Sequence, residues 1–167
     1  FHNWSVRHVS EFWNQFWDYS NIIHSAPYHQ VVDDEKKMPG AKWFPGSKLN
    51  YAENLLKYRD NRPAIHFKGE GQPTQTYSYS DLYNEVEQLA HSLRELGVKK
   101  GDRVAGFIPN MPQAIIAMLA TASIGAIWSS SSPDFGIKGV LDRFTQIEPK
   151  VIFAANGYYY NGKSFDS

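Results

Sequence analysis

The sequence predicts an α/β fold in which helices flank a mostly parallel sheet. From Ser78 onward, helical and strand patterns alternate strictly, as helix, strand, helix, strand, helix, strand. This order is typical of parallel strands joined by right-handed crossovers. The segment Arg103 to Ile108 is mostly apolar, as expected of a strand covered on both faces. We expect an aromatic helix and a long surface connection to precede the sheet.

The N-terminal segment Ser5 to Tyr19 predicts a helix with one strongly aromatic face and Ser5 as its N-cap. The residues of this face recur at three- and four-residue steps: Val6, Val9, Trp13, Phe16 and Trp17. Such a face serves either as an anchor packed on the body of the protein or as a helix that binds a partner. We expect the anchor.

Residues 22 to 47 lack periodicity and predict a long surface connection. Its charged run, Asp33 to Lys37, indicates solvent exposure, and Pro39-Gly40 and Pro45-Gly46 predict turns. We expect Trp43 and Phe44 to hold the connection in place. A short helix then follows over Asn50 to Leu56, in which Asn50 is the cap. Its inward side chains are expected to be Tyr51 and Leu55, with Leu56 beside them.

A hairpin and a long helix come next. Pro63 to Phe67 and Gln75 to Tyr79 predict its two antiparallel strands. Ser78 and Asp81 have the spacing of a capping box, which predicts a helix from Tyr79 to Leu96 that ends at Gly97. Its buried stripe is expected to be Leu82, Val86, Leu89, Leu93 and Leu96.

Two helix–strand units follow the strand 103–108. Pro112 suits a first helical turn, so we expect a helix over Gln113 to Ser123 and then a strand over Ala126 to Ser129. Ser130 to Asp134 predicts a polar loop. The second unit has a helix at Gly136 to Ile147 and a strand at Lys150 to Ala154. The inner face of this helix is expected to be Ile137, Val140, Leu141, Phe144 and Ile147. Asn161-Gly162 then predicts a hairpin, with Tyr158 to Tyr160 on one arm.

Composition excludes several classes of function. The 17 basic and 17 acidic residues give a formal net charge of zero, which does not suit a nucleic-acid-binding face. There are no cysteines, so the chain has no disulfide scaffold. We expect no signal peptide and no membrane span, because no apolar run is long enough. The six histidines are not placed for metal binding, and phosphate-loop, dinucleotide and nucleophile-elbow motifs are absent.

The direct candidates for chemistry are polar groups near the carboxyl ends of the predicted strands. Ser129 to Ser132 follow a buried strand, where crevices form in open α/β sheets. Their hydroxyls suit an anion, or they satisfy the backbone of the loop. Lys163, just after Asn161-Gly162, is a candidate for phosphate, or a surface lysine without a role.

Three blocks of sequence resemble the N-terminal part of the AMP-forming acyl-CoA synthetases, a family of adenylate-forming enzymes. The blocks are WFPGSKLNYAENLL (Trp43 to Leu56), the segment Lys99 to Gly136, and GVLDRFTQIEPKVIF (Gly139 to Phe153). Within the family, SSSSPDFG and YNGK (Tyr160 to Lys163) are similar to the branch that activates acetoacetate. The resemblance implies an N-terminal cover region over residues 1–60 and the incomplete first portion of the large ligase domain over residues 61–167.

This resemblance implies an acid–CoA ligase that converts acetoacetate, ATP and coenzyme A to acetoacetyl-CoA, AMP and pyrophosphate through an acyl-adenylate, with Mg²⁺ balancing phosphate charge. It implies a cytoplasmic enzyme acting on small molecules. The phosphate loop, acyl pocket and catalytic lysine of the family would follow Ser167, so we expect this chain to be a fragment without catalytic or metal-binding residues. It would need the remainder of the polypeptide to complete its fold.

The resemblance also places one wall of the coenzyme A site on this chain. The family has a Phe-Gly-Gly turn there, which falls on Ser132, Pro133 and Asp134, with Phe135 following. A basic pair that meets the 3′-phosphate falls on Tyr160 and Lys163, of which only Lys163 is charged. The implied contacts are Ser132, Asp134, Phe135 and Lys163. Two other functions stay open: a ligase for acetate, propionate or another short acid, and a non-catalytic α/β module that binds a nucleotide or a protein.

Overall fold

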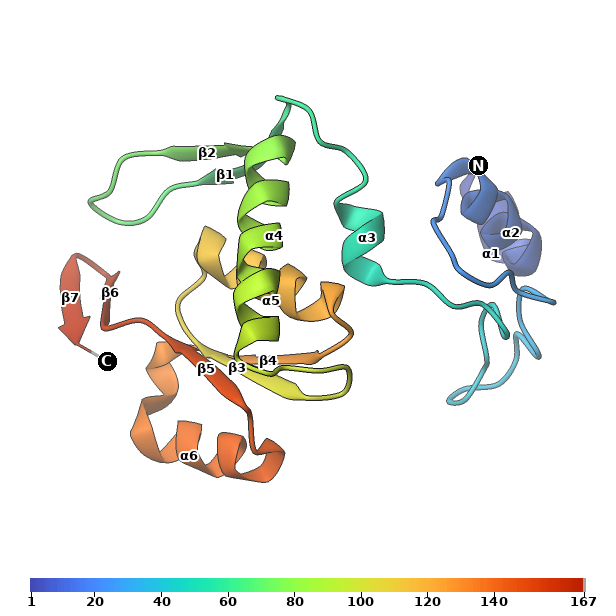
Figure 1. The fold of residues 1–167 in the computed structure, drawn as a ribbon. Coiled ribbons are helices and arrows are strands. Elements are labelled where there is room, and N and C mark those ends of the chain that lie inside the picture. Colours follow the sequence, from blue (N-terminus) through green and yellow to red (C-terminus); the bar gives the residue numbers. More distant parts are fainter. Residues whose placement is uncertain (167) are drawn as a thin grey trace. The chain divides into compact units, whose positions relative to one another are not determined.

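The computed structural model describes residues 1–166, and the chain divides into two compact units, Phe1–Asn54 and Leu55–Ser167 (Figure 1). The first unit has little regular structure beyond its helices. The second contains the sheet and its flanking helices. No helix among the described residues is both long and apolar enough to cross a membrane.

The N-terminal segment of the first unit forms two helices, α1 (His2–Arg7) and α2 (Val9–Tyr19), so the prediction of one helix from Ser5 is wrong. The break lies at His8, whose backbone leaves the helical region at φ −125° and ψ 59°. Ser5 lies inside α1 and is not a cap. Its hydroxyl donates to the carbonyl of His2 at 3.0 Å, the back-bonding that serine makes within a helix.

The aromatic face of α2 packs on the connection that follows it. The ring centroid of Trp17 lies 4.6 Å from that of Phe44 and 5.0 Å from that of Tyr28. Trp13 and Trp43 meet at 6.1 Å. Aromatic pairs at such distances add to the stabilisation from burial alone. The predicted role of Trp43 and Phe44 in holding the connection is therefore confirmed.

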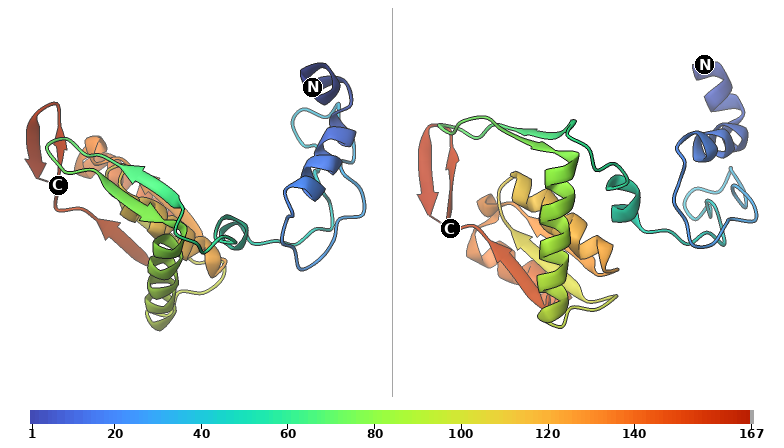
Figure 2. Two further views of the ribbon diagram at one scale, coloured as in Figure 1. Left: turned by 90° about the horizontal axis from the view of Figure 1, so that it is seen from above. Right: turned by 45° about the horizontal axis from the view of Figure 1, so that its top comes forward.

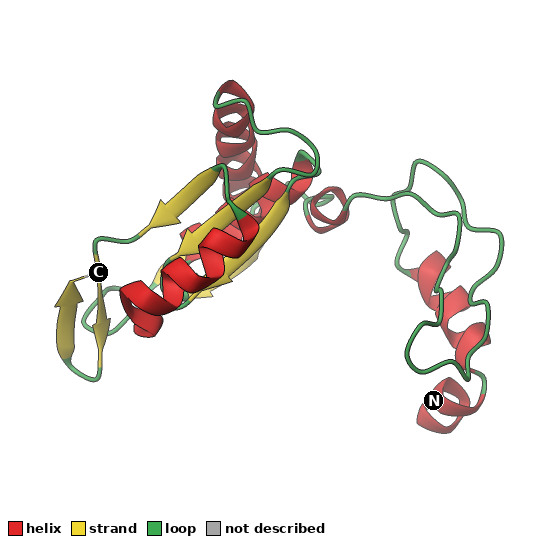
Figure 3. Cartoon of the chain, turned by 90° about the horizontal axis from the view of Figure 1, so that it is seen from below, coloured by secondary structure: helices red, strands yellow, loops and turns green. Residues whose placement is uncertain are grey.

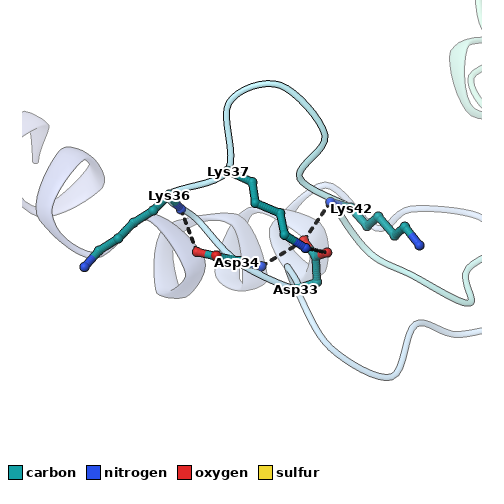
Figure 4. A network of polar contacts seen from close by, with 5 residues as sticks. All are labelled: Asp33, Asp34, Lys36, Lys37 and Lys42. Atoms are coloured by element: carbon teal, nitrogen blue, oxygen red, sulfur yellow. Dashed lines mark hydrogen bonds and ion pairs between the residues drawn. The ribbon is translucent and has the colours of Figure 1, made fainter.

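The charged run in this connection is organised around Asp33 (Figure 4). Its carboxylate accepts hydrogen bonds from Lys37 Nζ at 2.7 Å and from the backbone N–H groups of Lys42 and Asp34, both at 2.8 Å. The Lys37 ammonium and then the Lys42 N–H lower the pKa of Asp33 from 3.8 to about 2. Asp33 thus ties the two sides of the loop around Pro39.

We expect Asp33→Asn to reduce the acid dependence of stability. A carboxylate whose folded pKa is depressed stabilises the fold above its unfolded pKa, and the stabilisation is lost as pH falls through the folded pKa. The relevant window is therefore about pH 4 down to about pH 2, from the values 3.8 and 2. Urea unfolding across this window measures the effect, and Lys37→Ala should weaken the dependence in the same direction. If the free energy of unfolding of both variants fell with pH as it does in the parent, Asp33 would not be the group responsible.

The short helix α3 (Tyr51–Leu55) is capped as predicted, since Asn50 Oδ1 accepts from the N–H of Glu53 at 3.1 Å. Its predicted inward face is only partly right. Ala52 and Leu56 are buried, whereas Tyr51 and Leu55 are exposed. Ala52 lies in α3 and Leu56 directly follows its last residue, so the buried positions are four residues apart, as on one side of a helical turn.

The second unit begins with the predicted hairpin of β1 (Pro63–Phe67) and β2 (Gln75–Ser78), followed by α4 (Tyr79–Glu95). The capping box is confirmed: Ser78 Oγ accepts from the N–H of Asp81 at 3.0 Å, and Asp81 Oδ2 accepts from the N–H of Ser78 at 2.9 Å. The stripe Leu82, Val86 and Leu93 is buried, Leu89 is half-buried and Ala90 is buried as well. Leu96 is exposed because α4 ends at Glu95, before Gly97 turns the chain with φ 78°.

A parallel sheet with the strand order β4-β3-β5 forms the centre of this unit. It contains β3 (Arg103–Phe107), β4 (Ile127–Ser131) and β5 (Val151–Ala154). The crossover helices are α5 (Pro112–Ser123) and α6 (Gly136–Ile147). The connection from β3 to β4 and the connection from β4 to β5 run in opposite directions along the sheet, so right-handed crossovers put α5 and α6 on opposite faces. Figure 3 shows α6 lying across the face away from α4. The predicted fold class is confirmed.

The apolar stripe of α6 is less buried than expected. Phe144 is buried, but Ile137 and Leu141 are 79% and 55% exposed. Val140 and Ile147 are half-buried. Periodicity identifies the apolar face of a helix but does not say how much of that face the sheet covers. Three strands cover only part of a twelve-residue helix.

The centre of β3 is packed closely against an indole ring. A Cβ at Gly106 would lie 2.6 Å from Cη2 of Trp128. Trp128 on β4 and Phe153 on β5 meet across this glycine, with ring centroids 6.1 Å apart. A residue without a side chain on the middle strand therefore lets rings from both neighbouring strands meet.

Candidate functional site

The loop after β4 begins later than predicted. Ser130 and Ser131 belong to the strand, where they pair with Gly106 and Phe107 of β3. Their backbone groups are satisfied by the ladder, and serine side chains do not prevent that pairing. Successive side chains in a strand point to opposite faces, so the serines do not form one hydroxyl cluster. Ser131 is buried, and Ser132 is the first serine outside the strand.

Ser132 and Asp134 form a closed turn. Ser132 precedes the short 3-10 helix η1 (Pro133–Phe135) and is its N-cap. Its hydroxyl donates to Asp134 Oδ2 at 2.8 Å, and the N–H of Asp134 faces the same hydroxyl oxygen at 3.4 Å. Pro133 between them is buried. The side chains of the turn therefore hold its conformation without a ligand.

Asp134 also contacts Tyr158, on strand β6 (Gly157–Tyr160). Partial burial, followed by the hydrogen bond and the negative charge of Asp134, raises the pKa of Tyr158 above its ordinary value. The Asp134 carboxylate thus accepts from Ser132 and lies near Tyr158, so η1 and β6 are neighbours.

Phe135 is half exposed, and a cation covers one face of its ring. The guanidinium of Arg143 lies 4.1 Å from the ring centroid, within cation–π range. Arg143 Nη1 also donates to the carbonyl of Gly139 at 2.9 Å, which fixes the guanidinium on α6. Phe135 is 51% exposed, so ring surface remains open to a planar group such as a nucleobase.

Lys163 is the first residue of β7 (Lys163–Asp166), directly opposite Tyr160 in the antiparallel pair β6–β7. The turn before it is the predicted one, with Asn161 at φ 51° and Gly162 at φ 74°. Lys163 is exposed and makes no ion pair with any residue that the structure describes. Its ammonium is thus available to an anion.

The hairpin face that carries Lys163 is the face that meets η1. Tyr158 pairs with Phe165 and Tyr160 pairs with Lys163, so these four side chains share one face. The rings of Tyr158 and Phe165 stack at 5.4 Å. Because Tyr158 also contacts Asp134, the structure brings together Ser132, Asp134 and this face. Phe135 instead pairs with Arg143.

Three residues at the site were not singled out from the sequence: Arg143, the Tyr158 hydroxyl and Glu70. Glu70 lies in the loop between β1 and β2, and its carboxylate accepts from the N–H groups of Asn161 at 3.1 Å and Gly162 at 2.8 Å. The arginine four residues after Gly139 offered a weak local signal. Nothing local points to Glu70, which is 91 residues from its partner Asn161.

A hollow of about 190 Å³ lies at the carboxyl ends of β3 and β5. Its lining is mostly apolar and includes Ile108, Met111 and Phe153. None of the four candidate residues lines it. The candidate site is therefore a surface formed by η1 and the β6–β7 hairpin, separate from this hollow.

The chain matches two family descriptions in succession. The description "Acetyl-coenzyme A synthetase N-terminus" matches residues 1–55, and "AMP-binding enzyme" matches residues 52–165. Similar proteins include acetoacetyl-CoA synthetases of Rattus norvegicus, at 51% identity, and Gallus gallus, at 52%. Each alignment covers 97% of this chain and 25% of the relative.

A bacterial relative, acetoacetyl-coenzyme A synthetase of Rhizobium meliloti, is 46% identical over 99% of this chain and 25% of its own length. The solved acetoacetyl-CoA synthetase from Streptomyces lividans matches with a TM-score of 0.87 and 45% identity, covering 99% of this chain and 26% of that one. This chain therefore spans about a quarter of the length of these relatives. The resemblance drawn from the sequence blocks is confirmed, and the chain belongs to the family of AMP-binding enzymes.

Proposed function

We propose that this chain is the N-terminal part of an acid–CoA ligase that converts acetoacetate, ATP and coenzyme A to acetoacetyl-CoA, AMP and pyrophosphate through an acyl-adenylate. The observation that carries the proposal is the likeness, over 97% of the chain, to proteins named acetoacetyl-CoA synthetase. Similarity over almost every residue, at 51% identity, supports a shared reaction better than isolated motifs do. We further propose that residues 1–60 are a cover region and 61–167 the first portion of the ligase domain.

The contribution proposed for this chain is one wall of the coenzyme A site. Ser132 and Asp134 set the turn, Phe135 offers a ring face to the adenine, and Lys163 offers a charge to the 3′-phosphate. The exposed ring of Phe135, and the ammonium of Lys163 that forms no ion pair within residues 1–166, support these roles. Asp134 supports the site through its contacts with Ser132 and Tyr158, because a carboxylate would repel a phosphate.

ATP and Mg²⁺ belong to the proposed reaction, and we propose that it takes place in the cytoplasm. Over residues 1–166, no group of three or more His, Asp or Glu side chains is arranged to hold a metal ion. The role proposed for residues 1–166 is to support the coenzyme A half of the reaction.

A substrate panel with the full-length protein tests the proposal. Acid-dependent exchange of pyrophosphate into ATP should be greatest with acetoacetate, compared with acetate, propionate and malonamate. Malonamate is included because a protein named malonamoyl-CoA synthetase vrtB, of Penicillium aethiopicum, is 42% identical over 97% of this chain. If another acid gave the fastest exchange, that acid would replace acetoacetate as the proposed substrate. Absence of exchange with every acid would favour a non-catalytic binding module.

Lys163→Glu in the full-length protein should raise the KM for coenzyme A roughly 5- to 10-fold and leave adenylate formation unchanged. An exposed lysine–phosphate pair is weak, but a glutamate adds repulsion to the lost attraction. Steady-state kinetics with varied coenzyme A measure the first effect, and pyrophosphate exchange measures the second. Lys36→Glu is the matched control, since this exposed lysine lies in the first unit. Equal KM values in parent and variant would remove Lys163 from the site.

A further inference from the structure

The tip of the β6–β7 hairpin is held by a carboxylate from a distant loop. Glu70 Oε1 accepts from the N–H of Asn161 at 3.1 Å, and Oε2 accepts from the N–H of Gly162 at 2.8 Å. Figure 2 shows the loop between β1 and β2 reaching this turn. Both oxygens of one carboxylate thus bind two consecutive amides.

The backbone of the turn makes this contact possible. Asn161 and Gly162 both have positive φ, at 51° and 74°, and in such a turn these two N–H groups remain outside the ladder between the strands. A carboxylate accepts two parallel N–H bonds well, and hydrogen bonds to an ionised group are roughly twice as strong as neutral ones. Glu70 therefore fixes both the position and the orientation of the turn.

The hairpin needs such support because it is not part of the central sheet. β6 and β7 form a separate two-stranded sheet. An isolated two-stranded hairpin is marginally stable in water. The Glu70 carboxylate attaches its tip to the rest of the unit by two hydrogen bonds, and Asp134 lies near Tyr158 on β6. Lys163 follows Gly162 directly, so the residue proposed to meet phosphate lies next to the Glu70 contact.

We propose that Glu70 is a positioning residue for coenzyme A: by clamping the Asn161–Gly162 turn, it holds Lys163 where its ammonium meets the 3′-phosphate. This inference rests on the proposed coenzyme A contact of Lys163. No contact of Glu70 with the phosphate is proposed, because a carboxylate repels a phosphate, and its two oxygens accept from the turn. The clamp and a direct charge effect predict opposite changes in coenzyme A binding when Glu70 is removed. If Glu70 acted by its own charge near a phosphate, its removal would improve coenzyme A binding, whereas loss of a clamp weakens it.

Kinetics of the full-length protein with coenzyme A and with 3′-dephospho-coenzyme A test this role. Glu70→Ala should raise the KM for coenzyme A about 3-fold, within the range of an exposed ion pair, while kcat and pyrophosphate exchange stay at parent values. The KM for 3′-dephospho-coenzyme A should not change. Glu70→Gln keeps one acceptor oxygen and should lie between the parent and Glu70→Ala. Gln72→Ala, in the same loop, is the control and should match the parent.

A double variant separates this inference from the proposed function. If Glu70 acts through Lys163, Glu70→Ala adds nothing to Lys163→Ala, and the double variant has the KM of Lys163→Ala alone. Additive effects would overturn the inference, as would a lower KM or an equal rise for both forms of the cofactor. An effect of Lys163→Ala without one of Glu70→Ala would overturn only the clamp. No effect of Lys163→Ala would overturn the coenzyme A contact and the clamp with it.

Discussion

Leu93→Ala should lower the free energy of unfolding by about 2–5 kcal/mol. Leu93 lies in the last turns of α4, is 1% exposed, and belongs to the buried stripe of a helix that packs against α5. Truncation to alanine removes buried apolar atoms and leaves a cavity that well-packed neighbours fill only partly. Equilibrium unfolding in urea, compared with the parent protein, measures the loss.

The matched control lies three residues further along the same chain. Leu96 is 63% exposed, so Leu96→Ala removes the same atoms from a solvated site and should change stability by less than about 0.5 kcal/mol. Periodicity predicted that both leucines are buried, and the stabilities of the two variants test whether only Leu93 is. Similar losses in the two variants would contradict the burial described for α4.

Gly106→Ala should cost about 1–3 kcal/mol although it adds a single methyl group. The added Cβ would lie 2.6 Å from Cη2 and 2.7 Å from Cζ2 of Trp128. Carbon atoms attract at about 3.5–4.0 Å and repel strongly at the shorter distance. Gly106 lies on the middle strand, between Ser130 of β4 and Phe153 of β5, so the backbone cannot move aside freely.

A double-mutant cycle shows whether Trp128 is the cause. Phenylalanine lacks the outer ring that carries Cη2 and Cζ2, so Trp128→Phe should make room for the methyl group. We expect Gly106→Ala to cost at least about 1 kcal/mol less in the Trp128→Phe background than in the parent. Urea unfolding of the four proteins gives the coupling energy. A cost that is the same in both backgrounds would mean that the strain lies elsewhere in the sheet.

Local signals predicted most of the fold. The capping box at Ser78 and Asp81, the first-turn Pro112, and Asn161-Gly162 each determine backbone geometry within a few residues, and the structure has each of them. The alternation of helices and strands predicted the parallel sheet because right-handed crossovers leave few other arrangements. The split at His8 has no comparable signal, since the apolar spacing continues across it.

Burial and the site were predicted less well, for a different reason. Periodicity shows which side of a helix is apolar, but not where the helix ends or which segment covers it: Leu93 is buried on α4, which packs against α5, whereas Leu96 lies beyond the end of α4 and is exposed. The residue pattern singled out Ser132 and Lys163, the resemblance added Asp134 and Phe135, and the roles of all four remain predictions. The contacts of Asp134 with Tyr158, and of Glu70 with the turn at Asn161, depend on tertiary structure that no local spacing reports.

The position of Trp128 has a spectroscopic consequence. Of the five tryptophans in these 167 residues, four lie in the first unit, at Trp4, Trp13, Trp17 and Trp43, and Trp128 is the one in the second. The tryptophan fluorescence that Trp128→Phe removes would thus report on the sheet. The emission of the other four tryptophans in this sequence would report on the N-terminal unit. Melting of the two units could then be followed as separate optical signals, without an added dye.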